Sequence, residues 1–134
     1  MWKCALTLLA LALASKHSSA EKRIIICKTP ALAHSCFSLH GRLRYGNGTP
    51  ALRLWQIGTT HNFGILSGLN AEKLNPLDND HPRLPENIDR LYIDQNPFQV
   101  TIYADFEVCP LEPHIPGHMQ AACIESATHI TVKN

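Results

Sequence analysis

The chain lacks a strong charge of either sign. Only 17% of its 134 residues are charged, and the sequence has 12 Lys and Arg and 11 Asp and Glu, which gives a formal charge of +1. So small a net charge does not draw a whole molecule onto a polyanion, and we expect no nucleic acid as a partner. The length suits one domain of ordinary size and is too short for two.

A long apolar run is also missing. The longest, Cys4 to Ala14, covers eleven residues, about half of the roughly 20 needed to span a bilayer. Lys3 precedes this run and the small residues Ser18 to Ala20 follow it, an arrangement typical of a secretory signal peptide. We predict a signal peptide over 1–20, and cleavage after Ala33 is the alternative. The expected product is a single domain over 21–134 with no transmembrane segment, in a secreted or periplasmic location.

Cysteine is scarce, and the part of the chain after the predicted signal peptide contains an even number of cysteines. Without Cys4, which lies in the predicted signal peptide, four cysteines remain, namely Cys27, Cys36, Cys109 and Cys123. An even count in an oxidising compartment predicts two disulfides. Three pairings exist, and short loops favour Cys27 with Cys36 and Cys109 with Cys123. The second bridge would close a loop of about 15 residues, worth roughly 3 kcal/mol.

Helical periodicity is almost absent, and apolar residues instead recur at every second position, as in half-buried strands. The cleanest alternation runs over 98–108. Residues 37–45 and 51–57 form a predicted hairpin around the turn residues 46–50. Further strands are expected over 23–27, 62–66, 90–93 and 124–132, with one helical turn near 69–74. We therefore predict an all-β fold, a small antiparallel sandwich or barrel of six or seven strands braced by disulfides.

The usual enzyme signatures are missing, because the sequence has no Gly-x-Ser-x-Gly elbow, P-loop, dinucleotide fingerprint or His-Glu-x-x-His. Asp105 and Glu107 are the weak catalytic candidates. They share one face of a predicted strand, about 6.6 Å apart along it, a spacing that suits paired acid and base roles. The competing interpretation is an ordinary charged outer face.

His114 and His118 lie between Cys109 and Cys123, and two thiols with two imidazoles are a tetrahedral zinc ligand set. Oxidation of the cysteines competes with this interpretation. His114 and His118 alone stay weak metal candidates, and we expect no metal or other cofactor.

Trp55 and Arg53 are the candidate binding residues, because aromatic and arginine side chains dominate binding hot spots. A buried core tryptophan is the alternative for Trp55. The polar, proline-rich segments 67–87 and 110–119 are candidate binding loops.

Residues 41–50 (GRLRYGNGTP) resemble the opening strand and turn of transthyretin-like and carboxypeptidase-regulatory-like β-sandwich domains. The chain from residue 21 onward also resembles small secreted bacterial proteins of unknown function. The shared pattern comprises Cys-Phe at 36–37, Gly-Arg-Leu at 41–43, Asn-Gly-Thr-Pro at 47–50 and Ile-Gly-Thr at 57–59. This resemblance implies export and a single domain, and it points to no particular activity.

The sequence thus favours an exported binding or structural protein whose partner is an unidentified protein, peptide or glycan. The alternative from the enzyme class is a small secreted hydrolase that uses Asp105 and Glu107, or a metal site at His114 and His118.

Overall fold

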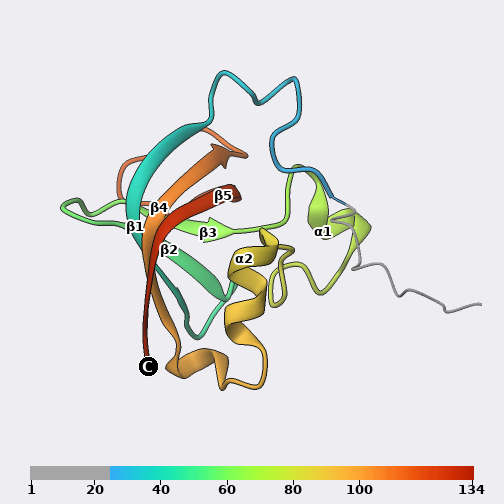
Figure 1. Cartoon of the computed structure of the whole chain (residues 1–134). Helices are drawn as coiled ribbons and strands as arrows, with labels where there is room; N and C mark the ends of the chain where they lie inside the picture. The colour runs from blue at the N-terminus through green and yellow to red at the C-terminus, as the bar shows by residue number, and fades with distance from the viewer. Residues whose placement is uncertain (1–24) are drawn as a thin grey trace, which may run out of the picture.

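The structure, a computed structural model, describes residues 25–134, so the predicted signal peptide lies outside the described residues. The chain forms a closed barrel in the order β1-β2-β3-β5-β4 (Figure 1). The five strands are β1 (Phe37–Tyr45), β2 (Leu52–Gln56), β3 (Asn62–Ile65), β4 (Thr101–Pro110) and β5 (Gln120–Lys133). The all-β prediction is confirmed, and the architecture is a barrel.

The strand order is a Greek key closed by one further strand. β4 lies beside β1, so the first four strands have the spatial order 4-1-2-3. β5 fills the gap between β3 and β4, antiparallel to β4 and parallel to β3. The expectation of six or seven strands is therefore wrong, because five strands close the barrel. Four of the five strand pairs are antiparallel, and the pair of β3 and β5 is parallel.

Two of the expected strands do not form among the described residues. The part of 23–27 that the structure describes is not a strand, and Arg90–Tyr92 is the 3₁₀ turn η1. Phe98 lies in a second such turn, η2 (Pro97–Gln99), so β4 begins later than the alternation suggested. Asn96 caps η2, because its side-chain oxygen accepts the N–H of Phe98 at 3.1 Å.

The connection between β3 and β4 contains two short helices, α1 (Ala71–Leu74) and α2 (Glu86–Asp89), and the expected helical turn near 69–74 is confirmed. Ile88 of α2 is fully buried and belongs to the barrel core. Asp78 is also buried, and it holds the connection together by accepting the backbone N–H of Ser67 at 2.9 Å and the Ser67 hydroxyl. No helix in this described part of the chain has the length and apolarity to cross a bilayer.

Alternate residues of each strand fill the interior. In β4 the four inward side chains are fully buried: Ile102, Ala104, Phe106 and Val108. In β2, Leu52 and Leu54 point inward, and Trp55 therefore faces outward. Gly41 is buried on the inner face, where an added Cβ would lie 2.6 Å from Cδ1 of Leu54. The core thus fixes which side chains of β1 and β2 face solvent.

Two disulfides form, but not between the neighbouring cysteines that short loops favour. Cys27 bonds Cys123, and Cys36 bonds Cys109, across sequence separations of 96 and 73. Barrel register explains the second bridge. Phe37 pairs with Val108, so the preceding Cys36 lies across from Cys109.

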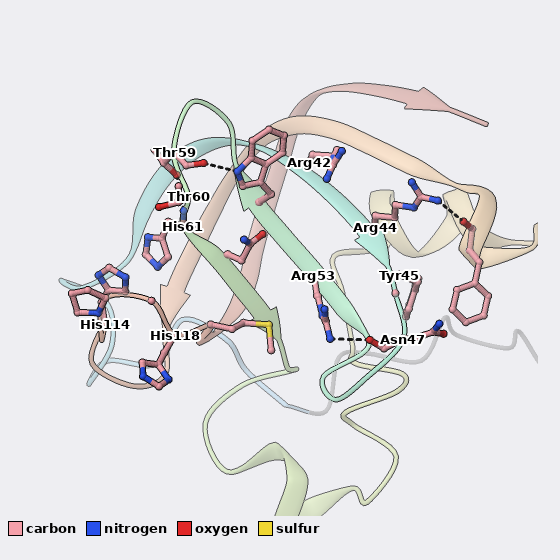
Figure 2. Close-up of a pocket in the computed structure, with 17 residues that line it drawn as sticks. Arg42, Arg44, Tyr45, Asn47, Arg53, Thr59, Thr60, His61, His114 and His118 are labelled. Carbon is pink, nitrogen blue, oxygen red and sulfur yellow. Dashed lines mark hydrogen bonds between the residues drawn. The ribbon is translucent and has the colours of Figure 1, made fainter.

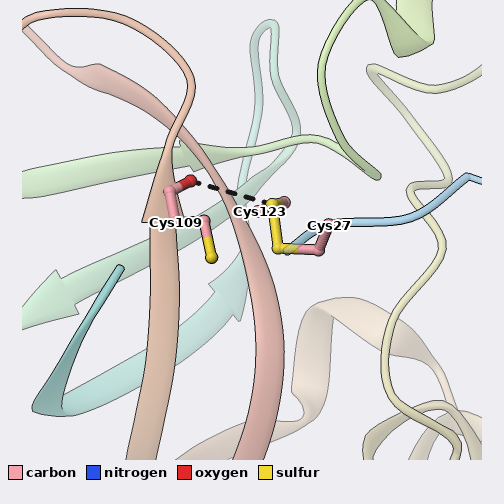
Figure 3. A group of neighbouring side chains, drawn as sticks. All are labelled: Cys27, Cys109 and Cys123. Atoms are coloured by element: carbon pink, nitrogen blue, oxygen red, sulfur yellow. Dashed lines mark hydrogen bonds between the residues drawn. A yellow bond between two sulfur atoms is a disulfide. The ribbon is translucent and has the colours of Figure 1, made fainter. Parts of the chain in front are cut away.

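The other bridge ties the N-terminal segment to β5 (Figure 3). Cys123 stands opposite Cys109 in the register of β4 and β5, and the sulfurs of Cys27, Cys109 and Cys123 lie within 4.8 Å of one another. All four sulfurs are oxidised. Cys109 and Cys123 are therefore not available as ligands for zinc beside His114 and His118.

Candidate functional site

An open groove of about 940 Å³ lies on the outer face of β1 and β2. Its rims are the β1–β2 turn, the β2–β3 turn and the β4–β5 loop (Figure 2). Arg42, Arg44 and Arg53 line it together with His61, His114 and His118, and no Asp or Glu contributes to the lining. The groove therefore carries positive charge although the whole chain is nearly neutral.

Strand register sets the arginines face to face. Arg44 of β1 is the direct partner of Arg53 of β2, and Arg42 is the partner of Trp55. All four face outward, because the alternate positions of these strands fill the core. Like charges directly opposite one another across a strand pair destabilise a sheet. The protein thus places two arginines at directly paired positions on the lining of the groove.

Each guanidinium is held in place without a counter-charge. Arg53 donates from Nη2 to the carbonyl of Asn47 at 2.9 Å, and Arg44 donates from Nη2 to the carbonyl of Phe98 at 3.5 Å (Figure 2). Arg42 lies over the Trp55 ring, 4.8 Å from its centroid. Within residues 25–134 none of the three forms an ion pair. A guanidinium has five N–H donors, so most of them stay available to a ligand.

Trp55 is half-buried on the groove wall, and it is not a core residue. Its indole N–H donates to the carbonyl of Thr59 at 2.6 Å, which fixes the ring against the β2–β3 turn. The structure thus brings the two sequence-predicted binding residues, Trp55 and Arg53, into one groove.

Histidines form the opposite wall. Nε2 of His61 donates to Oε1 of Gln120 at 2.9 Å, since an amide oxygen only accepts. The His61 ring stacks on His114 with centroids 4.0 Å apart. Burial, and then the neighbouring His114, lowers the pKa of His61. His61 is therefore neutral at neutral pH and its charge appears only in acid.

His114 and His118 are exposed on the β4–β5 loop, and both line the groove. They do not gather a set of metal ligands. Among residues 25–134, the only group of three possible ligand side chains within 4.8 Å consists of Cys27, Cys109 and Cys123, which are oxidised. The two histidines therefore belong to the groove wall.

Asp105 and Glu107 lie outside the groove, on the outer face of β4. Each oxygen of Asp105 accepts from an imidazole Nδ1 at 2.9 Å, one from His40 and one from His129. The hydrogen bond from His40, aided by that from His129, lowers the pKa of Asp105. Glu107 pairs with Lys28 at 2.8 Å. An ionised Asp105 has no proton to give, so this arrangement does not supply a general acid there at neutral pH.

The sequence interpretation did not include Arg42, Arg44 and His61 among the site residues. The two arginines occupy the polar positions of an alternating strand, which is also the pattern of an ordinary solvated face. Only the pairing of that strand with β2 marks them as a cluster. For His61 no signal was present, because its partners Gln120 and His114 are distant in sequence.

Comparison of the chain with models of protein families, with curated protein sequences and with solved structures finds no match. The functional conclusion therefore depends on the groove.

Proposed function

We propose that the protein is an exported binding protein whose groove takes an acidic ligand, one that carries carboxylate, sulfate or phosphate groups. The observation that carries this proposal is the register pair of Arg44 and Arg53, set in a groove with no acidic side chain. An anion between two guanidinium groups replaces their repulsion with two charge-assisted interactions.

The architecture supports the same location. A closed five-stranded Greek-key barrel is the architecture of OB-fold domains. Their ligands commonly lie across strands 2 and 3 and between the loops that join strands 1 to 2 and 4 to 5. The groove occupies the corresponding surface, with Asn47 on one loop and His114 and His118 on the other.

Export is part of the proposal, and two observations support it. The N-terminal sequence is typical of a signal peptide. The protein has two disulfides, and disulfides form and persist mainly in oxidising compartments. The likeness to small secreted bacterial proteins agrees with export and stays a prediction.

The experiment is a titration of the purified protein with inorganic tripolyphosphate and with citrate, two polyanions of different chemistry. Trp55 is the only tryptophan of residues 25–134, so its fluorescence reports events in the groove. We expect saturable binding that weakens as salt rises, and a loss of about tenfold or more in the double variant Arg44→Gln, Arg53→Gln.

Arg90→Gln is the matched control, because Arg90 is exposed on η1 and does not line the groove. This variant should bind as the wild type does. Equal losses in Arg90→Gln and in the double variant would mean that net charge, and not the groove, governs binding, and would overturn the proposal.

A further inference from the structure

The arginine groove continues into a second depression. This depression, of about 880 Å³, shares Tyr45 and Phe98 with the groove, and the residues of the β3–β4 connection that line it include Asn75, Asp80 and His81. The two together form one extended surface that turns around the Phe98 ring. A ligand that fills it must consist of at least two linked units.

Phe98 marks the junction. The ring is 52% exposed, and large exposed aromatic rings are characteristic of binding surfaces. Its backbone is fixed from both sides, since its N–H is bound by the Asn96 side chain and its carbonyl accepts from Arg44. The ring is thus presented at a defined position beside the arginine pair.

The chemistry of the second depression differs from that of the groove. Two carboxylates, Asp80 and Asp89, and the guanidinium of Arg83 line it together with the amide of Asn75, so this lining lacks the excess of cationic side chains that the groove offers to an anionic unit. The buried hydroxyl of Tyr92, on the same lining, has no hydrogen-bond partner within residues 25–134, a state that buried polar groups rarely keep. Donors and acceptors beside an exposed ring suit a neutral unit with several hydroxyl groups and one apolar face, which is a sugar ring.

Nucleobases fit this surface less well, because most of its aromatic faces are already occupied. Arg42 lies over Trp55, His61 stacks on His114 and packs against Phe63, and Tyr45 packs edge-on against Tyr92. Binding of a single strand needs a series of open rings on which successive bases stack. Of the Phe, Tyr and Trp side chains that line the groove, Phe98 alone is exposed.

We infer that the ligand is an acidic oligosaccharide, with the acidic group of one sugar between Arg44 and Arg53 and a neighbouring neutral sugar against Phe98. This inference rests on the proposed function, and it adds the class of the ligand and the second subsite.

The test compares four probes on the full mature chain by calorimetry and by Trp55 fluorescence. The probes are hyaluronan tetrasaccharide, in which uronate and neutral sugars alternate, free glucuronate, inorganic tripolyphosphate and an oligothymidylate. We expect the tetrasaccharide to bind about tenfold or more tightly than glucuronate. Phe98→Ala should remove that advantage.

Ile93→Ala is the matched control, because Ile93 is also an exposed apolar residue of the same connection and lines neither depression. Both side chains are exposed, so both variants should keep the far-ultraviolet spectrum of the wild type. Asp80→Asn is a second test of the neutral subsite. It should weaken binding of the tetrasaccharide and leave binding of tripolyphosphate unchanged.

Three results would overturn the inference. The first is equal affinity of the wild type and Phe98→Ala for the tetrasaccharide, and the second is equal affinity of the wild type for the tetrasaccharide and for glucuronate. The third is that oligothymidylate binds more tightly than the tetrasaccharide and that Phe98→Ala weakens this oligothymidylate binding. Each is distinct from failure of the proposed function, in which tripolyphosphate does not bind to the wild type at all.

Discussion

Nε2 of His61 lies 2.9 Å from Oε1 of Gln120, and this contact joins the β2–β3 turn to the β4–β5 loop. Gln120 is only 6% exposed, and its amide nitrogen donates to the carbonyl of Glu112 at 2.8 Å. The buried Gln120 side chain thus links the β2–β3 turn, which carries His61, to the β4–β5 loop, which carries His114 and His118.

We predict that Gln120→Leu lowers the free energy of unfolding by about 1 kcal/mol, because it removes the partners of the part-buried His61 N–H and of the Glu112 carbonyl. Denaturant unfolding measures this cost, and amide hydrogen exchange should accelerate in 111–119. Gln95→Leu, at an exposed position, serves as the control. Unchanged exchange in 111–119 would show that the loop does not depend on Gln120.

His61 makes stability depend on pH. Its pKa in the folded protein is lowered by burial and by His114, whereas an unfolded histidine titrates near 6.5. Below about pH 6.5 the unfolded chain therefore binds more protons than the folded one, and the free energy of unfolding decreases as the pH is lowered. His61→Gln should reduce the loss between pH 6.5 and 5 and leave the slope above pH 7.5 as it is. An identical acid slope in the variant contradicts the assignment.

Arg44→Gln should separate stability from binding. The substitution removes the like-charge pair with Arg53, so we expect the free protein to unfold with a free energy about 0.2–1 kcal/mol higher than that of the wild type. The same variant should bind tripolyphosphate more weakly. Thermal unfolding with and without the polyanion measures both effects, because a ligand that binds only the folded state raises its stability. A variant that is less stable and binds normally would assign Arg44 a purely structural role.

The disulfides should contribute most of the chain's stability. In the chain-entropy model, bridges that close loops of this length contribute about 4–5 kcal/mol each, at sequence separations of 96 and 73. We predict that a non-reducing peptide map links Cys27 to Cys123 and Cys36 to Cys109. Replacing either pair with serine should shift the denaturation midpoint strongly downward. A peptide that links Cys27 to Cys36 would refute the connectivity.

Asp105 should stabilise the protein above about pH 4 and lose this effect in acid. Its folded pKa lies below the usual value, so its stabilising effect is present above the unfolded pKa and disappears as pH falls through the folded one. Asp105→Asn should therefore be less stable than the wild type at pH 7, and the difference should shrink as the pH falls below the unfolded pKa of about 4. Tripolyphosphate binding should not change, because Asp105 lies outside the groove.

The sequence predicts the strands where alternation is long. Ile102, Ala104, Phe106 and Val108 repeat with period two and all point inward, and the arm 37–45 coincides with β1. Shorter segments carry less information. Residues 90–93 contain apolar side chains that suit a strand, but they continue from α2 into the turn η1.

The groove could not be predicted from the sequence, because its arginine pair depends on the register between β1 and β2. The turn between Tyr45 and Leu52 has six residues, one more than the predicted 46–50, and a slip of one residue would place Arg44 opposite Leu52 in place of Arg53. Closure of the barrel and the disulfide pairing depend on contacts between opposite ends of the chain. Local loop entropy favours Cys27 with Cys36, and the strand pairing that overrides it is not visible in the sequence.

The connectivity of the two bridges also constrains how the molecule is made. Cys27 and Cys36 leave the ribosome before their partners, which lie 96 and 73 residues further along the chain. An oxidant that meets the growing chain finds only the first two thiols, which are the wrong pair. Correct oxidation must therefore wait until β4 and β5 are in place, so that tertiary structure guides the covalent chemistry.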